Sequence, residues 1–136
     1  RVAEAVNAPG APGGPAEVVR FERVSTVAEL DARLKNVSRP VMLDFYADWC
    51  VSCKEMERFT FSDAKVKAEL AQMVLLQVDV TRNTPEDQQL LKRYRLFGPP
   101  GIIFFDKGGR EIPGLRVIGY QPADKFLHSL ALARSF

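Results

Sequence analysis

The sequence has no apolar run approaching the roughly 20 residues that a membrane-spanning helix requires. It also lacks an excess of either charge: 19 Lys and Arg side chains nearly balance 17 Asp and Glu, and the net charge of +2 is too small to indicate a nucleic-acid partner. Only two cysteines, Cys50 and Cys53, occur in 136 residues, which excludes a disulfide-stapled miniprotein. An apolar fraction of 46% and a charged fraction of 26% predict one ordinary globular domain.

The first 17 residues differ in composition from the rest. Residues 7–16 (NAPGAPGGPA) are almost entirely Pro, Gly and Ala, and they cannot bury enough apolar surface to offset the entropy of ordering. We predict a flexible linker over residues 1–17, followed by one domain over residues 18–136. A tether to another domain and a terminus without function both agree with this composition.

From residue 18 onward, strand patterns alternate with helix patterns, which is typical of α/β proteins. Strand patterns cover residues 18–24, 40–47, 73–80, 102–105 and 116–120. Helix patterns cover residues 27–36, 50 to past 59, 62–70, 84–94 and 122 onward, with caps expected at Thr26 and Ser62. The first strands should pair in parallel through right-handed crossovers, and the last two, joined by a turn at 107–110, should form an antiparallel hairpin. The prediction is a mixed sheet with helices on both faces.

Cys50 and Cys53 are separated by two residues and lie where a buried strand pattern changes to a helix. Cysteines at i and i+3 of a first helical turn can join their sulfurs, and the unpaired N–H groups there favour a thiolate on the first cysteine. We predict that Cys50 is the exposed, attacking thiolate and that the better shielded Cys53 resolves the mixed disulfide. Half of a zinc site, an inert structural disulfide and two unrelated buried thiols are the alternatives. A zinc site would need more ligands, since there is no third cysteine and the only histidine, His128, is on the last helix.

Two acidic residues are candidates for acid–base chemistry beside the cysteines. Asp44 interrupts an otherwise apolar strand, and burial there should raise its pKa, so that it passes a proton near neutral pH. We assign it to proton transfer at Cys53. Glu57 lies four residues after Cys53, one helical turn along, and is expected to share this role. The alternatives are a strand-end position in water for Asp44 and an ordinary solvated helix position for Glu57.

Trp49, Pro99 and Pro100 are the candidates for contact with a substrate. Trp49 directly precedes Cys50 and is expected to shield the sulfurs, unless it is a core aromatic. A proline at the approach to a strand cannot donate to the sheet and is often cis, so Pro100 is predicted to follow a cis peptide bond. Such a loop can lie against the cysteines and offer backbone groups to a peptide; a plain trans turn is the alternative.

Together these residues resemble the thioredoxin superfamily over about residues 18–134. Residues 41–57 (VMLDFYADWCVSCKEME), with residues 60–63 (TFSD) and 80–81 (VT), are similar to the C-terminal domain of the DsbD family of bacterial thiol:disulfide interchange proteins. The resemblance implies a thioredoxin-like mixed sheet, parallel in its first half with an antiparallel C-terminal hairpin. It also implies that Cys50 attacks, Cys53 resolves, Asp44 and Glu57 tune the site, and Pro100 is the cis-proline.

The resemblance further implies a periplasmic domain of a bacterial inner-membrane protein. Such a domain accepts electrons from the membrane-embedded domain of the same protein and passes them to a periplasmic N-terminal domain, which supplies periplasmic oxidoreductases and cytochrome c maturation. No cofactor and no metal ion are expected, and residues 1–17 would be the tether. Two positions depart from the family pattern: Pro99 has no N–H to offer a partner, and Gly101 stands where Thr is common.

The charges around the cysteines favour a protein-disulfide reductase. A disulfide is a strong oxidant when its thiolate is well stabilised. Here the two intervening residues are uncharged, the neighbouring charges are mainly acidic, and Lys54 is the only close cation. The dithiol should therefore be a good electron donor. A general thioredoxin-like reductase or disulfide isomerase with many substrates, and a redox-inactive binding module, are the alternatives.

Overall fold

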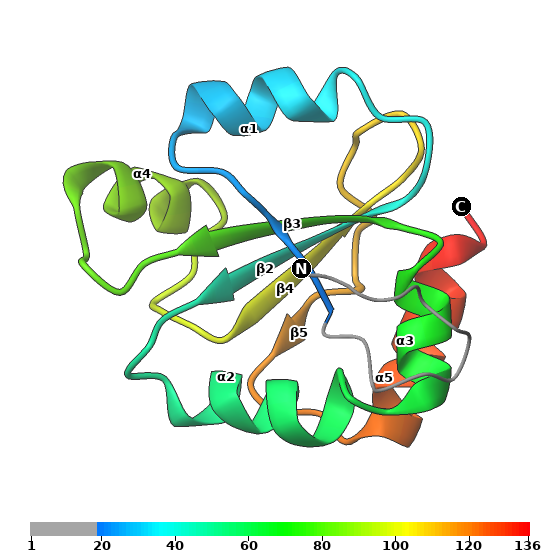
Figure 1. Ribbon diagram of the computed structural model, residues 1–136. Coiled ribbons are helices and arrows are strands. Elements are labelled where there is room, and N and C mark those ends of the chain that lie inside the picture. The colour runs from blue at the N-terminus through cyan, green and yellow to red at the C-terminus, as the bar shows by residue number, and fades with distance from the viewer. Residues whose placement is uncertain (1–18) are drawn as a thin grey trace, which may run out of the picture.

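The computed structural model describes residues 19–136, and the linker predicted for residues 1–17 lies outside this range. Its centre is a five-stranded sheet in the order β1-β3-β2-β4-β5 (Figure 1). The strands are β1 (Glu22–Arg23), β2 (Val41–Tyr46), β3 (Val74–Asp79), β4 (Gly101–Phe105) and β5 (Val117–Ile118). β1, β3 and β2 are parallel, whereas β4 runs antiparallel to β2 and β5 antiparallel to β4. The predicted mixed sheet is thus confirmed.

Helices cover both faces of this sheet, as predicted (Figure 1). One face carries α1 (Val27–Leu34) and α4 (Pro85–Arg93). The other face carries α2 (Val51–Glu55), its π-helical continuation η1 (Met56–Thr60), α3 (Ala64–Leu70) and α5 (Ala123–Arg134). Within residues 19–136, no helix is both long enough and apolar enough to cross a membrane.

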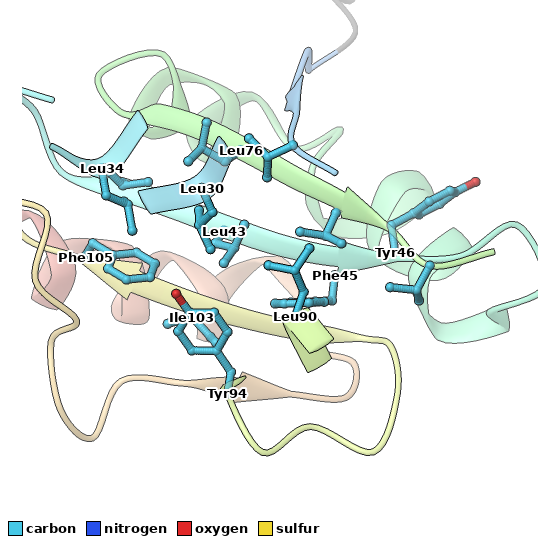
Figure 2. Close-up of a cluster of buried hydrophobic side chains, with 14 of the residues drawn as sticks. Leu30, Leu34, Leu43, Phe45, Tyr46, Leu76, Leu90, Tyr94, Ile103 and Phe105 are labelled. Atoms are coloured by element: carbon cyan, nitrogen blue, oxygen red, sulfur yellow. The ribbon is translucent and has the colours of Figure 1, made fainter. Parts of the chain in front are cut away.

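The sheet divides the apolar core into two clusters. Because successive residues of a strand point to opposite faces, Leu43 and Phe45 of β2 join one cluster and Met42 joins the other. Figure 2 shows the first cluster, in which Leu30 of α1 and Leu90 of α4 lie over the strands. Every residue of β2 is buried, which explains the nearly continuous apolar pattern in this part of the sequence.

Side chains at the helix starts satisfy backbone N–H groups that would otherwise be unpaired. Thr26 Oγ1 accepts a hydrogen bond from Glu29 N at 3.1 Å, and the Glu29 carboxylate accepts one from Ser25 N at 2.7 Å. Thr84 and Asp87 form a reciprocal capping box at the start of α4. The cap predicted at Thr26 is therefore confirmed, although the returning bond from Glu29 reaches one residue earlier than in a standard capping box.

The cap predicted at Ser62 is wrong by one residue. Asp63 caps α3, and its carboxylate accepts hydrogen bonds from the backbone N of Lys65 at 3.0 Å and of Val66 at 3.1 Å. Ser62 instead donates its hydroxyl to the carbonyl of Arg58 in the preceding helix. The Ser62 hydroxyl is thus engaged with the preceding helix, and the Asp63 carboxylate accepts from the first N–H groups of α3.

The two edge strands are shorter than the sequence predicts. The strand pattern at 18–24 yields only β1, and the pattern at 116–120 yields only β5, each of two residues. Each of these strands has one partner strand and pairs with it over only two positions. The turn predicted at 107–110 is confirmed, because Asp106 N donates to Arg110 O at 2.8 Å beside a bridge between Phe105 and Glu111. After the bridge at Glu111, the next residues that pair with β4 are those of β5.

Candidate active site

Cys50 and Cys53 form a disulfide at the start of α2. Cys50 is the N-cap residue, and its Sγ accepts a hydrogen bond from Cys53 N at 3.1 Å. Cys53 lies in the first turn, and its Sγ is 3.9 Å from the carbonyl oxygen of Phe45 on β2. The predicted position of the pair, at the change from strand to helix, is confirmed. The N–H group of Cys53 is therefore a donor able to stabilise a thiolate on Cys50 Sγ.

The predicted difference in exposure between the two cysteines is not seen in the disulfide form. Cys50 is 5% exposed and Cys53 is 4% exposed. Both belong to the same apolar cluster as Leu43 and Phe45 of β2, because the disulfide holds the two sulfurs together where α2 meets the end of β2. The two sulfurs differ instead in their neighbours: a backbone N–H faces Cys50 Sγ, and a backbone carbonyl faces Cys53 Sγ.

The disulfide excludes some of the alternative interpretations of Cys50 and Cys53. Two unrelated buried thiols are excluded, since the sulfurs are bonded to each other. Among residues 19–136, no three His, Cys, Asp or Glu side chains are grouped as a metal site would require. The choice left open by the geometry is between a redox-active and an inert disulfide.

Asp44 is buried in the middle of β2 with an exposed fraction of 6%. It directly precedes Phe45, whose carbonyl oxygen faces Cys53 Sγ. Burial raises the pKa of Asp44 from 3.8 to about 7, and the nearby Glu57 charge also raises it, against the hydrogen bond from Gln77 and the charge of Arg23. The strand-end alternative is therefore excluded, and the carboxyl group can exchange protons near neutral pH.

Two residues beside Asp44 were missed by the sequence reasoning. Gln77 on β3 is opposite Asp44 in the sheet register, and its Nε2 donates to Asp44 Oδ2 at 2.9 Å. Its Oε1 accepts from Arg23 Nε on β1 at 2.7 Å. A polar residue in the otherwise apolar run of residues 74–78 was the available signal for Gln77, whereas the contact with Arg23 depends on how β1 pairs with β3.

Glu57 is an exposed residue in the first turn of η1. Its carboxylate acts through space on Asp44 and raises the pKa of that group. The helix predicted from the cysteines past Phe59 is confirmed as one continuous element, but its second half is a π-helix rather than an α-helix. A π-helical turn inside an α-helix is rare and frequently occurs at functional sites.

Lys54, the one cation expected close to the cysteines, is engaged by another side chain. Its ammonium group donates to Tyr46 OH and lies 4.9 Å from the centre of the Tyr46 ring. The hydroxyl of Tyr46 in turn donates to Asp48 Oδ1 at 2.9 Å. The Lys54 ammonium group is therefore held against Tyr46 by one hydrogen bond and by its contact with the ring.

Trp49 lies on the surface next to Cys50 and is 60% exposed, so it is not a core aromatic. Its indole N–H donates to the carbonyl oxygen of Thr81 at 3.2 Å, just beyond the end of β3. The hydroxyl of Thr81 accepts from Asp48 N at 2.8 Å. The segment leading into the cysteines is thus held to the end of the neighbouring strand.

The peptide bond between Pro99 and Pro100 is cis, as predicted. Phe45 pairs with Gly101 in the register of β2 and β4, so Pro100 lies one position beyond this pair, at the end of β2 that leads to the cysteines. Pro100 O also accepts a hydrogen bond from Gly119 N at 3.4 Å, which joins this loop to the end of β5. Both prolines are half-buried.

Comparisons with known proteins agree with this geometry. The thioredoxin-like domain family matches residues 28–134. The thiol:disulfide interchange protein DsbD of Ralstonia nicotianae is 57% identical over 118 residues, which are 85% of this chain and 19% of that protein. DsbD of Pectobacterium atrosepticum is 49% identical over 108 residues, 79% of this chain and 19% of that protein. The chain thus spans about a fifth of the length of these relatives.

Solved structures give the same result. The C-terminal domain of Neisseria meningitidis DsbD in the oxidised form has a TM-score of 0.69 and 38% identity, and the match covers 83% of this chain and 100% of that domain. A thioredoxin from Thermus thermophilus has a TM-score of 0.65 and 32% identity, with 82% of this chain and 85% of that chain covered. The chain therefore belongs to the thioredoxin-like family, as a thiol:disulfide interchange domain similar to the C-terminal domain of DsbD.

Proposed function

We propose that this domain is a protein-disulfide reductase that relays electrons through Cys50 and Cys53. By similarity to DsbD, the donor is a membrane-embedded domain of the same protein, and the acceptor is a periplasmic N-terminal domain. The domain would then work in the periplasm as part of an inner-membrane protein. The observation that carries this proposal is the position of the disulfide at the start of α2. Cys53 Sγ is 3.9 Å from the carbonyl oxygen of Phe45, and the residue before Phe45 is Asp44, whose buried carboxyl group has a pKa of about 7.

The exchange takes place in two steps that move two electrons to the partner. In the reduced domain, the Cys50 thiolate attacks one sulfur of the partner disulfide, so that a mixed disulfide forms and the other partner sulfur leaves as a thiolate. Asp44 then accepts the proton of the Cys53 thiol. Cys53 attacks Cys50 Sγ, which closes the Cys50–Cys53 disulfide and releases the second partner sulfur.

The charges of the site support the reductive direction. A poorly stabilised thiolate makes the dithiol a better donor, because less free energy is gained by keeping the pair reduced. The cation closest in sequence, Lys54, bonds to Tyr46, and Asp44 and Glu57 add acidic groups on the same side of the sheet. The N–H of Cys53 acts in the opposite sense, because it faces Cys50 Sγ and can stabilise the thiolate.

Exposed apolar side chains next to the disulfide offer a surface for the partner. Trp49 and Val51 flank Cys50 in sequence, and both are more than half exposed. Phe97 is fully exposed ahead of the Pro99-Pro100 bond, and Ile118 on β5 pairs with Gly101 just after it. Because Pro99 and Pro100 lack an N–H, a partner strand could bond to the backbone of these two residues only through their carbonyl groups. We assign Trp49, Pro99 and Pro100 to this contact.

Trapping of the mixed disulfide tests the roles of the two cysteines. The Cys53→Ser variant should form a stable covalent complex with an oxidised N-terminal domain of DsbD, because the resolving thiol is missing. The Cys50→Ser variant is the matched control and should form none. A complex that forms only with Cys50→Ser reverses the assignment. Non-reducing electrophoresis and mass spectrometry of the complex give the readout.

Electron transfer in both directions tests the function itself. The reduced domain, mixed with an equal amount of oxidised N-terminal domain, should become oxidised, as measured by thiol labelling and mass spectrometry. The reverse mixture should react to a smaller extent. The domain would instead be a general reductase if, with dithiothreitol, it reduced insulin as fast as it reduces the N-terminal domain. Equal extents in both directions would contradict the reductase proposal.

A further inference from the structure

The buried amide of Gln77 lies between two partners of opposite character. Its Nε2 donates to Asp44 Oδ2 at 2.9 Å, and its Oε1 accepts from Arg23 Nε at 2.7 Å. Gln77 is 5% exposed, so neither bond is easily replaced by bulk water. Exchange between two cysteines does not by itself require an amide at this position.

The partner on β1 fixes the orientation of this amide. A guanidinium group only donates hydrogen bonds, so the oxygen of Gln77 must face Arg23 and its NH2 group must face Asp44. The NH2 group only donates, so Asp44 Oδ2 is an acceptor whether the carboxyl group is ionised or neutral. A neutral carboxyl group accepts better through its carbonyl oxygen than through its hydroxyl oxygen. The proton of neutral Asp44 is therefore directed to Oδ1.

We propose that Gln77, oriented by Arg23, is a positioning residue that keeps the exchangeable proton of Asp44 on Oδ1. The Arg23 side chain is 54% exposed and lies 3.1 Å from Asp79 Oδ2, so the chain of bonds reaches from the surface to the buried carboxyl group. We name this series of hydrogen-bonded side chains the Arg23–Gln77–Asp44 relay. The effect of the relay on disulfide exchange rests on the proposed function, in which Asp44 accepts the proton of Cys53. The hydrogen bonds of the relay do not depend on that proposal.

Orientation of the amide by Arg23 and a simple charge effect of Arg23 predict different changes in the titration of Asp44 when Arg23 is removed. The charged groups that act on Asp44 are Glu57 from η1 and Arg23 from β1, and among the influences on the pKa of Asp44 the direct charge of Arg23 is the weakest. If Arg23 acted only as a distant charge, its removal would change the titration of Asp44 little. If it orients the amide, its removal lets the Gln77 oxygen turn toward Asp44, where it accepts from the neutral carboxyl group and favours that form.

Carbon NMR of the Asp44 carboxyl group, in the disulfide form of the 136-residue chain, gives the titration directly. Gln77→Met removes the donor and should raise the midpoint by about one pH unit, and Arg23→Met should raise it by a similar amount. Arg23→Lys keeps a cation that only donates and should restore a midpoint near that of the wild type. Arg33→Met is the matched control, since Arg33 also pairs with a carboxylate of β1, Glu22, at 2.9 Å, and it should leave the midpoint unchanged.

The double variant shows whether Arg23 acts through Gln77. In the Gln77→Met background, Arg23→Met should add only a small further rise, because no amide is left to turn. Equal shifts in both backgrounds, or an unshifted midpoint in Gln77→Met, would overturn the proposal. If Gln77→Met does not fold, a shift in Arg23→Met no larger than that in Arg33→Met also overturns it. The titration requires no electron transfer, so the relay and the proposed reductase function can fail independently.

Discussion

The two faces of strand β2 bury neighbouring residues in different ways. Leu43 and Phe45 are both 0% exposed and lie in the apolar cluster beneath α1 and α4 (Figure 2). Asp44, between them in sequence, points to the other face and is buried with Gln77. One short strand therefore contributes a fully apolar face to the core and an ionisable group to the active site.

The difference shows how a small domain keeps a reactive carboxyl group without losing its fold. Burial of a large apolar side chain stabilises the folded state by about 1.5–3 kcal/mol at any pH. Burial of Asp44 costs more free energy when the group is ionised than when it is neutral, so this contribution depends on pH. The apolar clusters on both faces supply stability, and Asp44 uses part of it to hold a proton near neutral pH.

The largest effect should come from placing a polar side chain on the apolar face. Leu43→Asn leaves a cavity and buries an amide with no partner provided for it, and we expect a loss of about 5 kcal/mol in the free energy of unfolding. Urea denaturation at pH 4 and pH 8 should give the same loss, because neither side chain titrates. If the variant does not fold, Leu43→Ala should still show a loss of about 3 kcal/mol that is independent of pH.

An asparagine placed one residue later, at position 44, should instead raise the free energy of unfolding. The pKa of Asp44 is raised from 3.8 to about 7 in the folded protein, so the folded state binds this proton more tightly than the unfolded state. The wild type has the full benefit of this proton below pH 4 and loses it as the pH rises toward 7. Asp44→Asn has no proton to lose, and it should be more stable than the wild type by up to about 4 kcal/mol at pH 8 and nearly equal to it at pH 4.

The difference between the two unfolding curves at each pH measures this effect, because the other titrating groups cancel. A stability difference that does not change between pH 4 and pH 8 would show that the burial of Asp44 has little effect on its proton affinity. Asp44→Asn should also slow the resolving step, since the acceptor for the Cys53 proton is lost, and the mixed disulfide should accumulate. Greater stability with slower exchange is the signature of a group retained for chemistry.

The sequence predicts the part of the site that depends on local pattern. The positions of Cys50 and Cys53 follow from a strand that gives way to a helix, and the burial of Asp44 follows from the apolar residues on both sides of it. The cis bond at Pro100 follows from a proline directly ahead of a strand. These inferences need only the covalent order of the chain and the period of the secondary structure.

The rest of the site depends on contacts between distant segments. The bond from Arg23 to Gln77 joins residues 54 positions apart and requires the pairing of β1 with β3. The equal burial of Cys50 and Cys53 depends on how α2 meets the end of β2, and the pattern of η1 does not distinguish a π-helix from an α-helix. Tertiary packing decides these features, and no local pattern in the sequence marks them.

A smaller effect is expected where the turn at 107–110 meets the end of α1, at the rim of the apolar face. Gly109 has a φ of +81°, and a Cβ there would lie 2.2 Å from the carbonyl oxygen of Leu34. Gly114 has a similar φ of +79° but nothing within 4 Å of its Cβ position. Gly109→Ala should cost about 3 kcal/mol and Gly114→Ala about 1 kcal/mol in urea denaturation, both independent of pH. Equal losses would mean that the turn moves away from Leu34 freely.

The smallest effect should come from Glu57, which acts on Asp44 only through space. Glu57 is exposed, and its negative charge raises the pKa of Asp44 less strongly than burial does. Glu57→Gln removes that charge, so the ionised form of Asp44 becomes easier to form and the midpoint of its titration should fall by about half a pH unit at low ionic strength. The shift should shrink in 0.5 M salt, at a Debye length of about 4 Å, because ions reach the exposed Glu57. The desolvation of Asp44 should remain, since salt does not change the burial of that group. A midpoint that stays near 7 in Glu57→Gln at low salt would show that the buried face controls its proton without help from the surface.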